Sequence, residues 1–294
     1  MRFETKDGHI ISEQTVICGY SKQIGVYGVA AVANALAAEG AEHIGISVQI
    51  QIPDYGYQSR IHGLEKSIRK ICKEKDLELL EVKSGKSPVL RFAQVVVNGV
   101  AAVAETKTRK PEAGQAVVLL KWAGMEGMLR VTEEKEEQLK ERFSPAFLAQ
   151  IKSYAPQVFS MKEMRKAREA GAFGLRQIGE GGILAELYRM AKEEGLGLDL
   201  ELHNISLLQE TVEVCEQFHL NPYQMTSTGS FLAVVSDQSA FLRQMEEAGI
   251  PASMIGYFTD NNDKIIRNGE EIRYIDRPAP DAVYGIFSEP KEKE

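Results

Sequence analysis

The sequence predicts an α/β (α+β) protein of two domains, each with a mixed sheet and helices packed on it. The 294 residues are 44% hydrophobic and 26% charged, a composition typical of a chain with a large core and more than one domain. Segments in which apolar side chains alternate are interleaved with segments of helical periodicity. A stretch rich in charge, proline and glycine at residues 106–114 indicates a junction. We therefore expect domains at residues 1–110 and 111–294.

The first domain begins with a helix, a strand and a second helix. Residues 26–39 are rich in alanine, which favours a closely packed helix that stops at Gly40. Residues 44–52 alternate strictly between isoleucine or valine and glycine, serine or glutamine, which predicts a strand. Apolar residues three and four positions apart predict an amphipathic helix over residues 59–75.

Two Asn-Gly pairs lie within alternating runs. The first, Asn98-Gly99, interrupts an expected strand at 92–103 that follows one at 78–82, and predicts a bulge or a tight turn there. The second, Asn268-Gly269, lies in the middle of residues 264–275 and predicts a hairpin, because Asn-Gly suits the type I′ turn between paired strands.

The rest of the second domain is read from the same patterns. Proline and charge after Pro278 predict a disordered tail. The glutamate-rich helix expected at residues 132–142 should present a solvated face. The expected elements are a strand at 115–121, helices at 132–142, 160–170 and 183–194, and a strand, helix and strand at 230–235, 238–248 and 253–259.

Charge and cysteine content exclude several classes of function. The net charge of -7 gives no electrostatic reason to expect binding to nucleic acid or to an anionic membrane. Cys18, Cys72 and Cys215 are far apart, which indicates neither a disulfide framework nor a thiolate zinc site. No apolar run is as long as a membrane span, and the start lacks the apolar stretch of a secretory signal. We expect a cytoplasmic protein.

A glycine pair, Gly181-Gly182, opens an amphipathic helix after the lead-in Arg176-Gln177-Ile178-Gly179. Glycines at a helix start let backbone N–H groups approach an anion, and the helix dipole favours negative charge there. This turn is a candidate phosphate site. The alternative is an ordinary turn from loop to helix.

Six stretches keep the order and spacing of a known superfamily. They are Gly181-Gly182-Ile183-Leu184, residues 191–198, residues 211–216, Asn221-Pro222-Tyr223, Thr228-Gly229-Ser230-Phe231-Leu232 and residues 248–257. The chain thus resembles the PurM-like superfamily of aminoimidazole ribonucleotide synthetase, selenophosphate synthetase, thiamine-monophosphate kinase and HypE-type hydrogenase maturation proteins, with HypE-type proteins most similar. This resemblance implies a two-domain PurM-like fold and a homodimer joined through strands of the first domain, with residues 44–52 as the candidate interface strand.

Members of this superfamily bind ATP and magnesium at acidic residues. Asn34-Ala35 stands where the family has an Asn-Asp pair, Ser84-Gly85-Lys86-Ser87 where it has a Gly-Gly-His/Asp-Thr turn, and Arg176-Gln177-Ile178-Gly179 where it has His-Asp-x-Thr/Ser. The resemblance therefore implies ATP and magnesium as cofactors, while most of their ligands are replaced; it assigns no metal ligand and no catalytic residue. The implied nucleotide or phosphate-binding residues are Asn34, Gly85, Lys86, Ser87, Arg176, Gln177, Gly181 and Gly182.

Cationic side chains offer a second way to bind phosphate. Lys22, Lys86 and Arg176 are candidates for direct phosphate contacts, and the alternative is that they are ordinary surface charges. Gly85-Lys86-Ser87 resembles the end of a P-loop, but Leu80 stands where the first glycine belongs. The five histidines lack metal-ligand spacing, and Asp54 is interpreted as a turn former.

Two hypotheses for function follow. HypE-type proteins carry a carbamoyl group on a C-terminal cysteine, whereas the last cysteine here is Cys215, so that reaction is not expected. The first hypothesis is a divergent, HypE-like homodimer that binds a small molecule or nucleotide in a regulatory role and has lost magnesium–ATP chemistry. The alternative is an active ATP-dependent enzyme that activates an amide or carbonyl oxygen by phosphoryl transfer with altered ligands.

Overall fold

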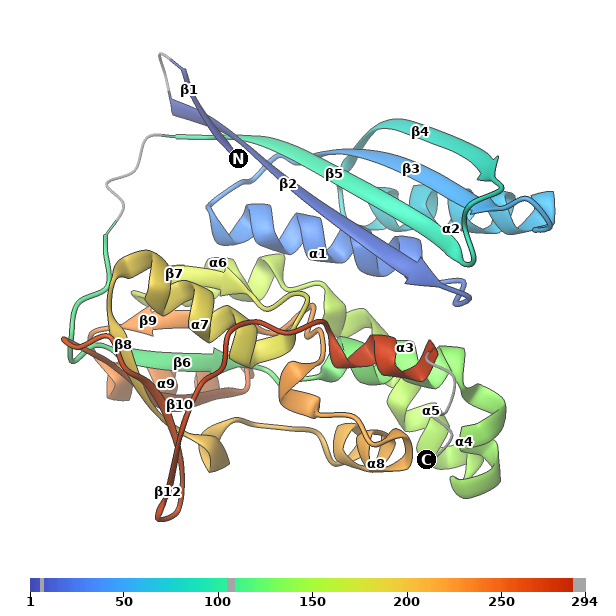
Figure 1. Ribbon diagram of the computed structural model, residues 1–294. Helices are drawn as coiled ribbons and strands as arrows, with labels where there is room; N and C mark the ends of the chain where they lie inside the picture. The colour runs from blue at the N-terminus through green and yellow to red at the C-terminus, as the bar shows by residue number, and fades with distance from the viewer. Residues whose placement is uncertain (6–7, 105–108, 288–294) are drawn as a thin grey trace. The chain divides into compact units, whose positions relative to one another are not determined.

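The computed structural model describes residues 1–5, 8–104 and 109–287, and it divides the chain into two compact units, Met1–Lys107 and Thr108–Glu294. Each unit is a mixed sheet with helices packed on it (Figure 1), so the expected fold class is confirmed. Part of the expected junction, residues 105–108, lies outside the described residues. Among the residues that the structure describes, no helix is both long and apolar enough to cross a membrane.

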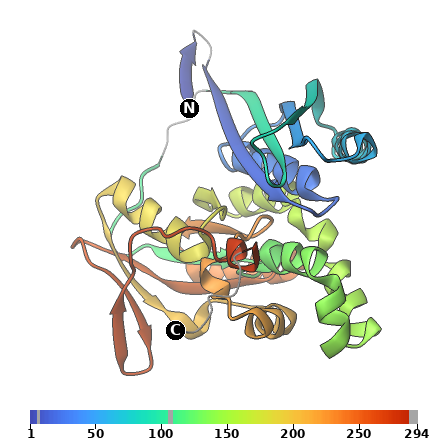
Figure 2. The same ribbon diagram turned by 45° about the vertical axis from the view of Figure 1, so that its right-hand side comes forward.

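The first unit has a five-stranded sheet in the order β1-β2-β5-β3-β4. Strands β3 and β4 are parallel and the other neighbours are antiparallel. Helices α1 and α2 lie side by side on the same face (Figures 1 and 2). The strands are β1 (Arg2–Thr5), β2 (Gly8–Gly19), β3 (Gly45–Pro53), β4 (Glu78–Ser87) and β5 (Ala93–Val103), and the helices are α1 (Ile24–Ala38) and α2 (Gln58–Glu74).

Strand β3 shows why the alternating pattern was informative. Ile46, Val48, Ile50 and Ile52 are all buried, because they face the two helices, while the intervening polar residues face the other way. The predicted strand over residues 44–52 is therefore confirmed. The pairing of β2 with β5 along almost their whole length was not anticipated.

The expected interruption of β5 at Asn98-Gly99 is wrong. The strand pairs without a register shift on both sides of Gly99. A Cβ atom at Gly99 would lie 2.3 Å from Val32 Cγ1 and 2.7 Å from Leu36 Cδ1 on helix α1. The glycine is thus required by close helix–sheet packing and not by a turn.

The second unit has a seven-stranded sheet in the order β12-β11-β8-β10-β6-β9-β7. Its strands are β6 (Ala116–Leu120), β7 (Phe173–Gln177), β8 (Gly197–Glu201), β9 (Phe231–Val235), β10 (Ala252–Thr259), β11 (Lys264–Asn268) and β12 (Glu271–Tyr274). All five residues of β6 and of β9 are buried, which places the core at the centre of this sheet. The predicted Asn-Gly hairpin is confirmed as β11–β12, with Asn268 opposite Glu271, and it projects from the unit in Figure 2.

The helices of this unit are α3 (Met125–Glu134), α4 (Glu136–Arg142), α5 (Pro145–Ser153), α6 (Met161–Glu169), α7 (Gly182–Glu194), α8 (Gln209–Phe218) and α9 (Gln238–Glu247). Short 3-10 turns are η1 (Ala155–Val158), η2 (Leu202–Asn204), η3 (Pro222–Gln224) and η4 (Ala282–Phe287). The single helix expected at 132–142 is wrong: α3 ends and α4 begins at Lys135, whose backbone leaves the helical region.

The expected disorder after Pro278 is also wrong as far as Phe287. Residues 282–287 form η4 beside α3, where Val283 is fully buried and Ile286 is 7% exposed. Two buried apolar side chains hold this segment in place, although its composition is that of a flexible tail. Residues 288–294, the end of the predicted tail, lie outside the described residues.

Candidate functional site at the start of helix α7

The turn between β7 and α7 is built by glycines in the left-handed region of backbone conformation. Gly181 has a φ of 85° and Gly182 a φ of 70°. A Cβ atom at Gly182 would lie 2.5 Å from the carbonyl oxygen of Tyr223 and 2.7 Å from the amide nitrogen of Met225. Backbone conformation and close packing against the chain at residues 223–225 therefore both require glycine here.

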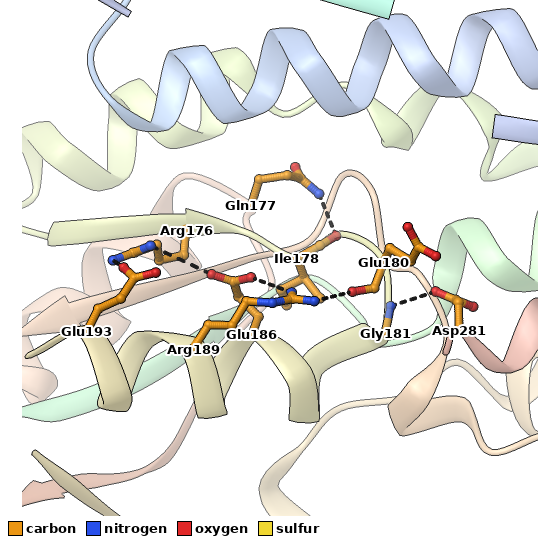
Figure 3. Close-up of polar contacts among 9 residues, drawn as sticks. All are labelled: Arg176, Gln177, Ile178, Glu180, Gly181, Glu186, Arg189, Glu193 and Asp281. Atoms are coloured by element: carbon orange, nitrogen blue, oxygen red, sulfur yellow. Dashed lines mark hydrogen bonds and ion pairs between the residues drawn. The ribbon is translucent and has the colours of Figure 1, made fainter. Parts of the chain in front are cut away.

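The N–H groups of the glycine pair already have acceptors. Gly181 N donates to Asp281 Oδ2 at 2.8 Å, and Gly182 N donates to the carbonyl oxygen of Gly179 at 3.1 Å. Figure 3 shows Asp281 beside the amide of Gly181. The predicted phosphate position is thus occupied by a carboxyl group of this chain.

Arg176, proposed from the sequence as a phosphate ligand, is paired with acids of helix α7. Its Nη2 donates to Glu193 Oε2 at 2.5 Å, and its Nη1 lies 4.0 Å from Glu186 Oε1. Arg189 completes the network in Figure 3, with Nη1 at 3.2 Å from Glu186 Oε2 and Nη2 donating to the carbonyl oxygen of Glu180. Burial raises the pKa of Glu186, while the charges of Arg176 and Arg189 oppose that rise. Arg176 therefore meets carboxylates that compensate much of its charge.

Gln177, the last residue of β7, has one buried side-chain atom without a hydrogen-bond partner among the described residues. Its Nε2 donates to the carbonyl oxygen of Ile178 at 2.7 Å. Its Oε1 is buried and accepts no hydrogen bond from the residues that the structure describes. A buried acceptor without a donor is costly, so an N–H or O–H group that came within reach of this oxygen would offset that cost.

A buried acid–arginine cluster next to this turn was missed in the sequence. Glu126 on α3 is fully buried, and Thr226 Oγ1 donates to its Oε2 at 2.5 Å. Arg130, one helical turn later and 5% exposed, has its Nε 3.7 Å from Glu126 Oε1. Burial raises the pKa of Glu126, and Arg130 opposes that rise. The available signal was two opposite charges four residues apart in a segment that is otherwise largely apolar.

The candidate residues of the first unit are not gathered in one place. Asn34 is fully buried on α1 and lies between Val32 and Leu36 along the helix. Val32 and Leu36 pack against Gly99 of β5, which pairs with Ile46 near the start of β3. Lys86 pairs with Ile52 near the end of β3, and six residues along a strand span about 20 Å. Asn34 and Lys86 therefore lie toward opposite ends of the sheet.

The stretch from Ser84 to Ser87 is strand rather than turn. Gly85, Lys86 and Ser87 belong to β4 and pair in parallel with Gln51, Ile52 and Pro53. The Lys86 ammonium is exposed and donates to the carbonyl oxygen of Asp54 at 3.1 Å. Across the described parts of both units, no group of three or more His, Cys, Asp or Glu residues is arranged to hold a metal ion.

The fold and the sequence both match known proteins. A family model described as the C-terminal domain of AIR synthase related proteins matches residues 112–268, more than half of the chain. The chain belongs to the AIR synthase-related family. This assignment, with the HypE-type similarities that follow, confirms the superfamily expected from the six stretches.

Three similar proteins illustrate the family relationship. A protein of Methanocaldococcus jannaschii named for hydrogenase expression and formation is 22% identical, over 95% of this chain and 82% of its own length. The carbamoyl dehydratase HypE of Bradyrhizobium diazoefficiens is 22% identical, over 80% of this chain and 67% of its own. The crystal structure of E. coli HypE superposes with a TM-score of 0.75 at 15% identity, over 92% of this chain and 86% of that one. The structural likeness is one of fold.

Proposed function

We propose that this AIR synthase-related protein is a HypE-like homodimer that binds a small molecule or a nucleotide in a regulatory role and does not use the magnesium–ATP chemistry of its superfamily. The site that we assign to the second unit is the turn at the end of β7, where Gln177 and the glycine pair lie together. The alternative, an active ATP-dependent enzyme, requires that other groups replace the missing acids.

The observation that carries the proposal is the side chain at position 177. The resemblance places a metal-binding acid here, and the chain has a neutral amide whose Oε1 is buried without a donor. An amide supplies no negative charge to offset a divalent cation, whereas its oxygen readily accepts from a hydroxyl or amino group. Such donors are present on the ribose and base of a nucleotide. The position therefore favours a hydrogen-bonded organic ligand over a metal ion.

The first unit offers supporting observations. Ala35 replaces the aspartate of the family's Asn-Asp pair. Lys86 brings an ammonium, which has no lone pair for a metal, to the position of another polar ligand of the family. Two positions that the resemblance links to magnesium and nucleotide thus carry groups unable to bind a cation.

Calorimetric titration separates the two hypotheses. We expect adenosine monophosphate to bind equally with and without magnesium, and ATP with magnesium to release no phosphate. Gln177→Ala should weaken binding by about 2- to 10-fold, the value of one hydrogen bond. Gln244→Ala, at an exposed glutamine of α9, is the matched control and should leave the affinity unchanged. Magnesium-dependent binding of ATP with turnover would establish the enzyme hypothesis instead, and equal affinity in Gln177→Ala would remove the site.

The open face of the first sheet supports the dimer. Helices α1 and α2 cover one face, and on the other the register aligns Val16 of β2 with Val96 of β5 and Gln49 of β3. Val16 and Val100 are 41% and 42% exposed, so apolar area is available for a second copy. The proposed interface strand β3 contributes the polar part of this face.

Light scattering coupled to size exclusion tests the dimer. We expect a mass of two chains for the wild type and of one chain for Val16→Glu, because a buried unpaired carboxylate opposes association. Val89→Glu is the control, since Val89 is 87% exposed in the β4–β5 connection, and it should stay dimeric. A monomeric wild type would refute this part of the proposal.

A further inference from the structure

An acidic side chain in the segment after β12, Asp281, hydrogen-bonds the start of α7. Asp281 is 3% exposed; its Oδ2 accepts from Gly181 N at 2.8 Å, and its Oδ1 accepts from Val283 N at 2.9 Å. The segment then continues as η4 beside α3, as the path after β12 in Figure 1 shows. Gly181 and Asp281 are 100 positions apart, so this contact fastens the end of the described chain to the β7–α7 turn.

The same carboxylate belongs to the buried cluster on α3. The charges of Glu126 and Asp281 interact with each other, and both interact with Arg130. The Arg130 guanidinium also lies 5.7 Å from the ring centre of Tyr284 on η4. Two carboxylates and one guanidinium, all at most 5% exposed, leave an excess negative charge when both acids are ionised. Excess charge in a buried position is unfavourable unless a proton neutralises it.

We propose that Asp281–Phe287 is a proton-controlled clasp, seated on Gly181 and α3 while the Glu126–Asp281 pair holds one proton, and released from them when both carboxylates are ionised. Opening exposes Asp281 to water, where it ionises readily, and frees the Gly181 N–H. This inference is independent of the proposed function, because it concerns the state of the clasp and not the ligand.

The groups around Asp281 determine the direction of the response. Burial opposes the ionised form of Asp281, as do the charges of Glu180 in the turn and of Glu126. The N–H groups of Val283 and Gly181 and the charge of Arg130 on α3 favour it. Burial is the largest effect and raises the pKa of Asp281. A carboxyl group with a raised pKa takes up a proton when the segment seats. The seated state is therefore most stable at low pH and loses stability as the pH rises through the raised pKa.

Hydrogen exchange measured by mass spectrometry on the full chain tests the clasp. Protection factors, from which the intrinsic pH dependence of exchange is removed, are compared from about pH 4, near the ordinary pKa of an aspartate, to about pH 9. We expect the protection of residues 282–287 to fall by up to about tenfold per pH unit in the transition, the value for one linked proton. Amides of β6 should keep their protection, because the core does not open with the clasp.

Two substitutions remove the carboxylate pair without removing its shape. Asp281→Asn should make the protection of residues 282–287 independent of pH. Glu126→Gln should move the loss of protection to a different pH, because it removes the charge of Glu126 but not the burial of Asp281. Asp276→Asn, an exposed acid of the same segment, is the matched control and should retain the wild-type profile. If the protection of residues 282–287 in the wild type does not depend on pH, the proposal is refuted, even when both variants fail to fold. It is also refuted if η4 and β6 lose protection together. Retention of the whole wild-type pH profile in either folded variant also overturns it.

Discussion

Substituting Gly182 by alanine should destabilise the second unit more than the same change at the other end of the same helix. Gly182 begins α7 and Gly195 follows its last residue, and the two have nearly equal φ values, 70° and 69°. A Cβ atom at Gly195 would meet nothing within 4 Å, whereas at Gly182 it would lie 2.5 Å from the Tyr223 carbonyl oxygen. Each alanine costs about 1–2 kcal/mol for its left-handed backbone. The clash, which only a backbone shift relieves, adds about 1–3 kcal/mol at Gly182.

Urea unfolding followed by tryptophan fluorescence measures this difference. The single tryptophan, Trp122, lies in the second unit with its ring 5.9 Å from that of Tyr154, so its emission reports on that unit. We expect a free energy of unfolding lower by about 1–2 kcal/mol for Gly195→Ala and by about 2–5 kcal/mol for Gly182→Ala. Equal losses of unfolding free energy in the two variants would refute the packing argument, and would mean that Gly182 is required only for its backbone conformation.

Three more predictions concern other parts of the chain. Gly99→Ala should lower the free energy of unfolding of the first unit by about 1–3 kcal/mol, measured by circular dichroism. Gly85→Ala is the control and should lower it by less than about 1 kcal/mol, because a Cβ atom at Gly85 would have no atom within 4 Å. Equal losses in the two variants would contradict the close packing of α1 on Gly99. Burial raises the pKa of the Cys215 thiol to about 12, so iodoacetamide at about pH 8 should modify it only in the unfolded protein, as mass spectrometry would reveal. The bidentate hydrogen bonds from Arg267 lower the pKa of Asp199. The ion pair, whose side chains are 34% and 35% exposed, contributes about 1 kcal/mol at most to stability; this contribution is present at neutral pH and is lost as the pH falls through the lowered pKa. In thermal unfolding, Asp199→Asn should therefore lack this loss of stability in acid.

Local patterns correctly predicted those elements whose signal lies within a few residues. The alternation of β3 reports one buried face, and Asn268-Gly269 marks the hairpin of β11–β12, whose two turn residues are Gly269 and Glu270. The same reasoning failed at Asn98-Gly99, where the glycine serves a helix some 65 residues earlier in the chain. Strand β2 escaped notice because Glu13 and Gln14 interrupt its apolar pattern, while pairing with β5 continues past them. An identical local signal can thus have a remote cause.

The candidate site divides in the same way. By itself, the sequence determined the family resemblance, the glycine pair at the start of α7 and the replacement of an acid by Gln177, since these are properties of neighbouring residues. Only the tertiary structure decided that Asp281 accepts a hydrogen bond from the amide of Gly181 and that Glu126 and Arg130 are buried nearby. Contacts across 100 positions depend on which surfaces pack together, and burial of apolar residues such as Val283 brings the carboxylate there. No spacing rule within the chain encodes that placement.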